Sequence, residues 1–293
     1  MNLKKTIIKG ISTALIASAI YFPFSLQFQS HSCGEKNKTQ GMNDIRPGNK
    51  LESIIYSYDN NNCGISDEAL KNLDDCVYEI TAKTRYFEGE GISLTGIGTG
   101  IVLKEGYFLT AEHVVRTVET IESPLGASRD SKPKTRYYIS KNSGEKYELE
   151  PVVTDKGWIS DDKIDFALLR IKKFDENKTK PFAGRLGSST MLRKGDFLYM
   201  LGNMYSYGVN LGVAVVGQEV GGDGYFPYRM LSNVGDSGGA VFALKNKMPE
   251  LVGLLIGGKF KPGQTAQIPY ATGISGILKK ISEYKPELVR LWR

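Results

Sequence analysis

Short runs of apolar or alternating residues follow one another along the chain from Val77 onward, and glycine interrupts nearly every gap between them. Such runs, bounded by turn residues, are typical of β-strands, and strands at this close spacing favour a sandwich or a barrel. The sequence therefore predicts an all-β domain over residues 77–293. The predicted strands cover 77–83, 98–103, 107–110, 137–140, 147–153, 166–171, 197–201, 211–220, 228–231, 239–242 and 251–256.

Clear helical periodicity is found at the C-terminal end of the chain, over residues 274–284. A shorter helix is predicted over 66–76, because Ser66 is a typical N-cap and Leu70 and Leu73 are spaced to share one helical face. The fold class is therefore all-β with a C-terminal helix, and the short helix ends the segment ahead of the strands.

The first thirty residues have the layout of an export signal. Lys4, Lys5 and Lys9 precede an uncharged stretch, residues 10–26, in which the chain is mostly apolar. We expect residues 1–30 to be a signal peptide or a retained signal anchor, and both alternatives stay open because this stretch is at the short edge for a membrane span. In either case the remainder is exported, so we expect an extracytoplasmic location, periplasmic, secreted or anchored to the membrane.

Residues 31–76 are expected to form a polar linker that ends in the short helix, because they are rich in Asn, Lys, Gly and Ser up to residue 62. The formal charge of the whole chain is +6, and three leader lysines supply half of it, so we expect no nucleic-acid partner. Two histidines and three cysteines show no metal-ligand spacing, so we expect no metal and no other cofactor. Export permits a disulfide between Cys63 and Cys76, and the sequence leaves its formation open.

The strongest chemical signal is the pentapeptide Gly235–Gly239, with the sequence Gly-Asp-Ser-Gly-Gly. A nucleophilic serine needs an exposed hydroxyl on a tight turn, and glycines around it allow backbone conformations that other residues avoid. Backbone N–H groups on such a turn can stabilise the oxyanion of a tetrahedral intermediate. Ser237 is therefore the candidate nucleophile.

Serine needs a general base, and within the predicted domain, residues 77–293, the chain has one histidine, His113. It follows the predicted strand 107–110, and its imidazole is suited to accept and return a proton near neutral pH. The imidazole in turn needs a carboxylate to orient it. Among Asp161, Asp162 and Asp165 we favour Asp165, because it begins an apolar strand while the other two lie in a polar loop.

The chain order of these residues separates the known serine-hydrolase folds. The α/β-hydrolases also carry G-x-S-x-G but place their histidine after the serine, and no histidine follows Ser237. The subtilisin order, Asp before His before Ser, requires an α/β architecture that the strand pattern opposes. The order His113, Asp165, Ser237 is the chymotrypsin order.

Four segments together resemble the trypsin-like serine peptidases, and in particular the bacterial HtrA/Deg-type protease domain: Gly98–Leu103, Leu109–Val115, Asp165–Arg170 and Gly235–Gly239. The resemblance implies a chymotrypsin-like double β-barrel with the site in the cleft between the barrels. It assigns His113 as the base, Asp165 as its partner and Ser237 as the nucleophile. It also assigns the oxyanion hole to the N–H groups of Gly235 and Ser237, and no PDZ domain is expected after the peptidase region.

The sequence departs from the family at several positions. No trypsin-like activation sequence precedes the domain, although Asp236 stands before the serine as in trypsins. Ile256 stands where trypsins place a serine beside the catalytic aspartate, so the sequence does not show how Asp165 is held. The resemblance gives Leu231, Ser232, Ile256 and Gly257 as substrate-binding positions. None of these is a carboxylate, so we expect a preference for a small or medium apolar residue rather than for Arg or Lys.

The sequence thus predicts a serine endopeptidase that hydrolyses peptide bonds of exported or unfolded proteins through an acyl-enzyme. Its expected partners are protein or peptide substrates, and the sequence does not indicate an oligomeric state. The alternative is a catalytically inactive protein that uses the same fold for binding. An esterase is opposed by the residue order but not by the acyl-enzyme chemistry.

Overall fold

The computed structural model describes residues 65–85, 93–116, 134–141, 144–155, 164–203, 209–218, 224–229, 235–260, 267–289 and 292. All of these belong to the second of two units into which the chain divides, Asp44–Arg293. The predicted leader and most of the linker lie outside these ranges, as do Cys33 and Cys63. Among the residues that are described, no helix has the length and apolarity that crossing a bilayer requires.

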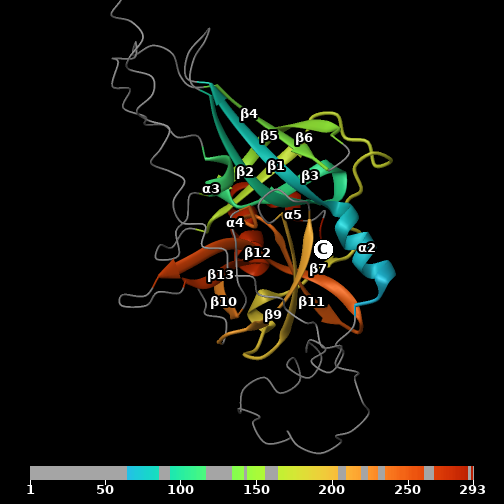
Figure 1. Ribbon diagram of the computed structural model, residues 1–293, viewed down its shortest axis with the longest axis vertical. Coiled ribbons are helices and arrows are strands. Elements are labelled where there is room, and N and C mark those ends of the chain that lie inside the picture. Colours follow the sequence, from blue (N-terminus) through green and yellow to red (C-terminus); the bar gives the residue numbers. More distant parts are fainter. Residues whose placement is uncertain are drawn as a thin grey trace, which may run out of the picture. The chain divides into compact units, whose positions relative to one another are not determined.

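The N-terminal half of the described chain forms a closed antiparallel barrel of six strands (Figure 1). The ring is closed because the first strand pairs with both the second and the fourth. Apolar side chains that alternate along the strands fill its interior, among them Ile80, Phe108 and Leu169. In ring order the strands are β1 (Val77–Arg85), β2 (Ser93–Val102), β3 (Tyr107–Thr110), β6 (Phe166–Ile171), β5 (Lys146–Asp155) and β4 (Lys134–Ser140).

The C-terminal half forms a second ring, which a pairing between its first and last strands closes. Its interior is again apolar, with Leu198, Phe226 and Val241 fully buried. The ring order is β11 (Ala240–Lys245), β8 (Phe197–Gly202), β9 (Asn210–Val216), β10 (Tyr225–Arg229), β13 (Gln267–Gly273) and β12 (Met248–Phe260), and the short β7 (Arg185–Leu186) adds to β12 in parallel.

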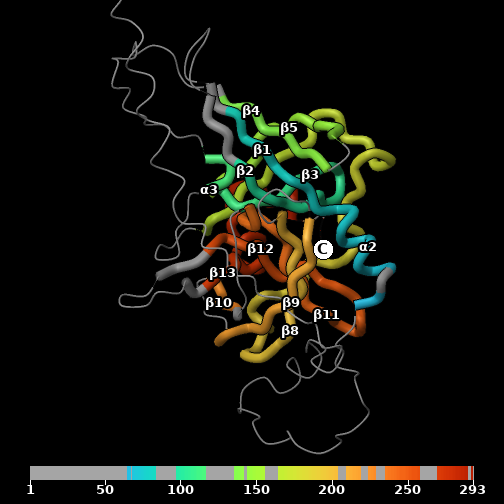
Figure 2. Tube along the Cα trace, in the orientation of Figure 1, coloured from blue at the N-terminus to red at the C-terminus, as the bar shows by residue number. Residues whose placement is uncertain are grey.

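Helices precede, connect and follow the strands of the two barrels (Figures 1 and 2). Helix α2 (Asp67–Cys76) leads into β1, and the Ser66 hydroxyl caps it by accepting a hydrogen bond from the Ala69 N–H. Helix α4 (Ile274–Tyr284) follows β13 and buries one apolar face in a core cluster that contains residues of both barrels. Within the described ranges, the other short helices are α3 (Glu112–Val115), α5 (Pro286–Val289) and the 3-10 turns η1 (Lys104–Gly106) and η2 (Ser189–Met191).

The structure confirms the predicted fold class, a chymotrypsin-like double barrel with a C-terminal helix, and the bounds of α4 agree with the prediction. Strand β13 was not predicted, and β10 begins at Tyr225 rather than at residue 228. Both strands contain a proline, Pro269 and Pro227, and proline is uncommon within strands because it cannot donate a ladder hydrogen bond. Cys76 is a free, buried thiol, and Cys63, its candidate disulfide partner, lies outside the described residues.

Candidate active site

Asp165 and His113 meet because the strands that carry them are neighbours. His113 follows the end of β3 as the second residue of α3, and Asp165 directly precedes β6. Since β3 and β6 pair antiparallel, with Thr110 opposite Ala167, the end of one strand lies beside the start of the other. Both residues are therefore at the same edge of the first barrel.

The His113–Asp165 contact uses both carboxylate oxygens. The His113 ring atom Nδ1 lies 2.6 Å from Asp165 Oδ2, and the His113 backbone N–H donates to Oδ1 at 3.1 Å. The Asp165 side chain is 2% exposed, whereas that of His113 is 28% exposed. A buried carboxylate thus fixes a ring that is itself partly exposed, as a base that exchanges protons with a substrate requires.

The second barrel holds the main chain of Asp165. The Asp165 N–H donates to the Tyr225 hydroxyl at 2.9 Å, and the Thr272 hydroxyl donates to the Asp165 carbonyl at 3.3 Å. Tyr225 and Thr272 lie opposite each other on β10 and β13, so one cross-strand pair holds both sides of the residue. The sequence left the support of Asp165 open, and neither hydroxyl has a local signal that could have identified it.

Ile256, at the position where trypsins have a serine, is buried and belongs to the same apolar cluster as Val115 and Tyr225. Next to it, Gly257 has a backbone φ of +105°, and a side chain there would meet no atom within 4 Å. It lies at a register shift between β12 and β13. The other two predicted substrate-binding residues, Leu231 and Ser232, are outside the described ranges.

Ser237 is the partly exposed member of an otherwise buried turn, Gly235–Gly239. Gly235 and Gly238 have φ values of +98° and +83°, which other residues rarely adopt, so the turn requires glycine at both positions. Hydrogen bonds fix the turn on both sides, because the Gly238 N–H donates to Leu255 at 2.6 Å and the Thr99 N–H donates to the Ser237 carbonyl at 2.8 Å. Within the described chain, the N–H groups of Gly235 and Ser237 donate to no acceptor.

The serine turn packs against the residues on either side of His113. A Cβ added to Gly238 would overlap the Thr110 hydroxyl and lie 3.0 Å from the Ala111 nitrogen. A Cβ added to Gly98 would lie 2.6 Å from the Val114 side chain and 2.9 Å from the Ser237 carbonyl. Ser237 and His113 make no hydrogen bond with each other here, and catalytic hydrogen bonds are often long before substrate binds. The tertiary structure thus gathers all three candidate residues at one place.

Asp236, the residue before the serine, is buried beside the end of β8. A Cβ at Gly202 would lie 2.6 Å from its Oδ1 atom, so the carboxylate lies directly on that glycine. This contact places the carboxylate against the end of β8.

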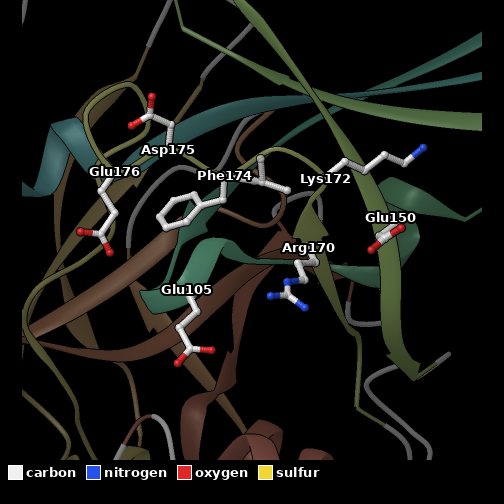
Figure 3. Close-up of a pocket in the computed structure, with 8 residues that line it drawn as sticks. Glu105, Glu150, Arg170, Lys172, Phe174, Asp175 and Glu176 are labelled. Atoms are coloured by element: carbon white, nitrogen blue, oxygen red, sulfur yellow. The ribbon is translucent and has the colours of Figure 1, made fainter.

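A separate hollow of about 910 Å³ lies at the other end of β6 (Figure 3). Its lining includes Arg170 and Ile171 at the end of β6. An extended strand rises about 3.3 Å per residue, so Ile171 lies roughly 20 Å along the chain from Asp165. Among the described residues, four carboxylates, two cationic side chains and the apolar Ile171 and Phe174 line it. This hollow is distinct from the site that contains His113. In the described part of the chain, no cluster of acidic, histidine or cysteine side chains is arranged to hold a metal ion.

Comparison with known proteins agrees with this geometry. A family model described as a trypsin-like peptidase domain matches residues 98–254, more than half of the chain. No curated protein matches the sequence. The fold is similar to that of the HtrA-type protease AlgW with a tripeptide, at 18% identity and a TM-score of 0.50, over 74% of this chain and 63% of that chain. It is also similar to a serine endoprotease from Yersinia pestis, at 19% identity and a TM-score of 0.50, over 78% of this chain and 68% of that chain.

Proposed function

This chain belongs to the trypsin-like peptidase family, and we propose that it is a serine endopeptidase with Ser237 as nucleophile, His113 as general base and Asp165 as the orienting carboxylate. The contact that carries the proposal is the 2.6 Å pair between His113 Nδ1 and the buried Asp165 carboxylate. The glycine-rich serine turn, packed on both flanks of His113, supports it further.

The proposed reaction follows from the proton positions that these contacts favour. With Nδ1–H directed at Asp165, the other ring nitrogen of His113 is free to take the proton of the Ser237 hydroxyl as its oxygen attacks the scissile carbonyl. His113 then returns that proton to the leaving amine, and an acyl-enzyme remains on Ser237. A water molecule, activated by His113 in the same way, hydrolyses the ester and releases the second product.

The oxyanion of each tetrahedral intermediate would be stabilised by the N–H groups of Gly235 and Ser237. Each such donor contributes about 10²–10³ to kcat in serine peptidases. Both groups are uncommitted within the described chain, and the positive φ of Gly235 gives the turn a shape that other residues would resist.

The proposed substrates are peptide segments of exported or unfolded proteins. The leader motif supports the location, and the tripeptide in the AlgW structure supports peptides as the ligand class. Ile256 and Gly257 bring no charge to the proposed substrate-binding positions, which supports a small or medium apolar residue at the cleavage site.

The test is covalent labelling of the full chain by a fluorophosphonate probe, followed by cleavage of an unfolded protein such as casein. Ser237→Ala and His113→Ala should each abolish labelling and cleavage. The matched controls are Ser282→Ala, which removes an exposed hydroxyl on α4, and His31→Ala, which removes the other histidine of the chain. Both controls should label at the wild-type rate. A folded wild-type protein that is neither labelled nor active would overturn the proposal in favour of a binding protein.

A further inference from the structure

Thr99 is a fully buried residue of β2 and makes contacts with both ends of the candidate oxyanion hole. Its N–H donates to the carbonyl of Ser237 at 2.8 Å, and its hydroxyl donates to the carbonyl of Gly235 at 2.8 Å. These are the two residues whose N–H groups form the proposed hole. The side chain and the backbone of Thr99 thus hold both residues through their carbonyl groups.

The Thr99 hydroxyl has its proton direction fixed by a second partner. The backbone N–H of Asn203, which follows β8, donates to Thr99 Oγ1 at 2.9 Å. A hydroxyl has one proton, so the oxygen that accepts from Asn203 directs its own proton to the remaining neighbour, the Gly235 carbonyl. The Thr99 carbonyl in turn accepts from the Thr110 hydroxyl at 2.5 Å, so the strand itself is held in place.

Asn203 also makes a second hydrogen bond to the first barrel, in addition to the one with Thr99. Its side-chain Nδ2 donates to Glu79 Oε2 on β1 at 2.5 Å, and a hydrogen bond to a charged carboxylate is stronger than one between neutral groups. Asn203 is 2% exposed. The network therefore connects β1 and β2 of the first barrel with the end of β8 and the serine turn of the second.

The turn needs this support because of its composition. Gly235 has no Cβ, so its backbone is free to rotate over a wider range than that of any other residue, and its φ of +98° is one choice among several. The hydrogen bond to its carbonyl fixes the Gly235–Asp236 peptide unit, and the hydrogen bond to the Ser237 carbonyl fixes the Ser237–Gly238 unit. The unit between them, which carries the Ser237 N–H, is therefore held on both sides. From these contacts we propose that Thr99 is the positioning residue of the oxyanion hole, holding Gly235 and Ser237 through their carbonyls. This inference rests on the proposed peptidase function of Ser237.

The test compares Thr99→Val, which keeps the shape of the side chain and removes the hydroxyl, with Thr99→Ser, which keeps the hydroxyl. Removing a hole donor costs about 10²–10³ in kcat, and loosening one should cost less, so we expect Thr99→Val to lower kcat by about 10- to 100-fold. KM should stay within about threefold, because the oxyanion exists only in the transition state and intermediates. Thr99→Ser should restore kcat to within about threefold of wild type.

Thr179→Val is the matched control, because Thr179 is also fully buried and its hydroxyl donates to the Asp175 carbonyl at 3.1 Å, outside the serine turn. It should lower thermal stability without changing kcat. If Thr99→Val does not fold, Thr99→Cys replaces it, because a thiol is a weaker donor and acceptor, and an intermediate loss of kcat is expected.

The outcomes separate this inference from the function on which it rests. Wild-type turnover that depends on Ser237 but is unchanged in Thr99→Val or Thr99→Cys would overturn the positioning role alone. A loss of kcat in Thr99→Val that Thr99→Ser does not restore would also overturn it. A wild-type protein without Ser237-dependent turnover would overturn both proposals together.

Discussion

Replacing Asp165 with asparagine tests the proposed base in the most direct way, because the surroundings dictate how the new amide must sit. The His113 backbone N–H donates to Asp165 Oδ1, so the amide oxygen of an asparagine has to take that place. Its NH₂ group then faces His113 Nδ1, where Oδ2 now lies at 2.6 Å. Two donors cannot share that contact, so Nδ1 must give up its proton and the other ring nitrogen must carry it.

An imidazole protonated on the nitrogen that should face Ser237 cannot accept the serine proton. In serine triads this change of tautomer lowers kcat by about 10⁴. At 1.36 kcal/mol for each factor of ten, that is a rise of about 5.4 kcal/mol in the activation barrier. The fold should survive, because Tyr225 and Thr272 hold the main chain of Asp165 rather than its carboxylate.

The assay is the pseudo-first-order rate of fluorophosphonate labelling, together with kcat on a peptide ester and the melting temperature. Asp161→Asn is the matched control: it makes the same chemical change at the carboxylate that competed with Asp165 in the sequence, and should leave the labelling rate unchanged. A folded Asp165→Asn protein that labels within tenfold of wild type would refute the reasoning, and so would an Asp161→Asn variant with the larger loss.

Two further predictions concern stability. Gly238→Ala should lower the free energy of unfolding by more than about 2 kcal/mol in urea denaturation, because the φ of Gly238 is +83° and the new methyl group would overlap the Thr110 hydroxyl. The control is Gly144→Ala, where φ is +79° and the surrounding space is open, so only the backbone cost of about 1–2 kcal/mol is expected. Equal losses in the two variants would contradict this account. Burial raises the pKa of the Cys76 thiol from 9.0 to about 12, so the unfolded chain loses this proton at a lower pH than the folded chain. The contribution of the thiol to stability is therefore fully present below pH 9 and should fall by about 1.4 kcal/mol per pH unit between pH 9 and 12. The slope should be absent from the stability curve of Cys76→Ser and should appear in the difference between the two proteins; parallel curves for the two proteins would show that the thiol does not contribute.

Both halves of the candidate site depend on contacts that cross between the barrels. Tyr225 and Thr272 of the second barrel hold Asp165 of the first, and Thr99 of the first barrel holds the serine turn of the second. The geometry of the candidate site therefore depends on how the two barrels pack against each other.

Features that depend on local chemistry could be predicted from the amino-acid sequence. The glycine-rich turn around Ser237, the lone histidine of residues 77–293, and the order of His113, Asp165 and Ser237 were enough to predict the residue types of the site. The family resemblance that these residues carry implied the double barrel. Helix α4 was predicted with its observed bounds because its apolar spacing is a local pattern, and Ser66 caps α2 for the same reason.

The contacts that hold these residues could not be predicted, because they depend on tertiary structure. The Asp165 amide finds its acceptor 60 positions away at Tyr225, and the Thr99 hydroxyl donates to Gly235 across 136 positions. Asn203 reaches Thr99 across 104 positions. A hydroxyl or amide with a partner so distant in sequence has the same local pattern as one that faces water. Strand pairing brings the partners together, and the register of two closed barrels determines which hydroxyls support the site.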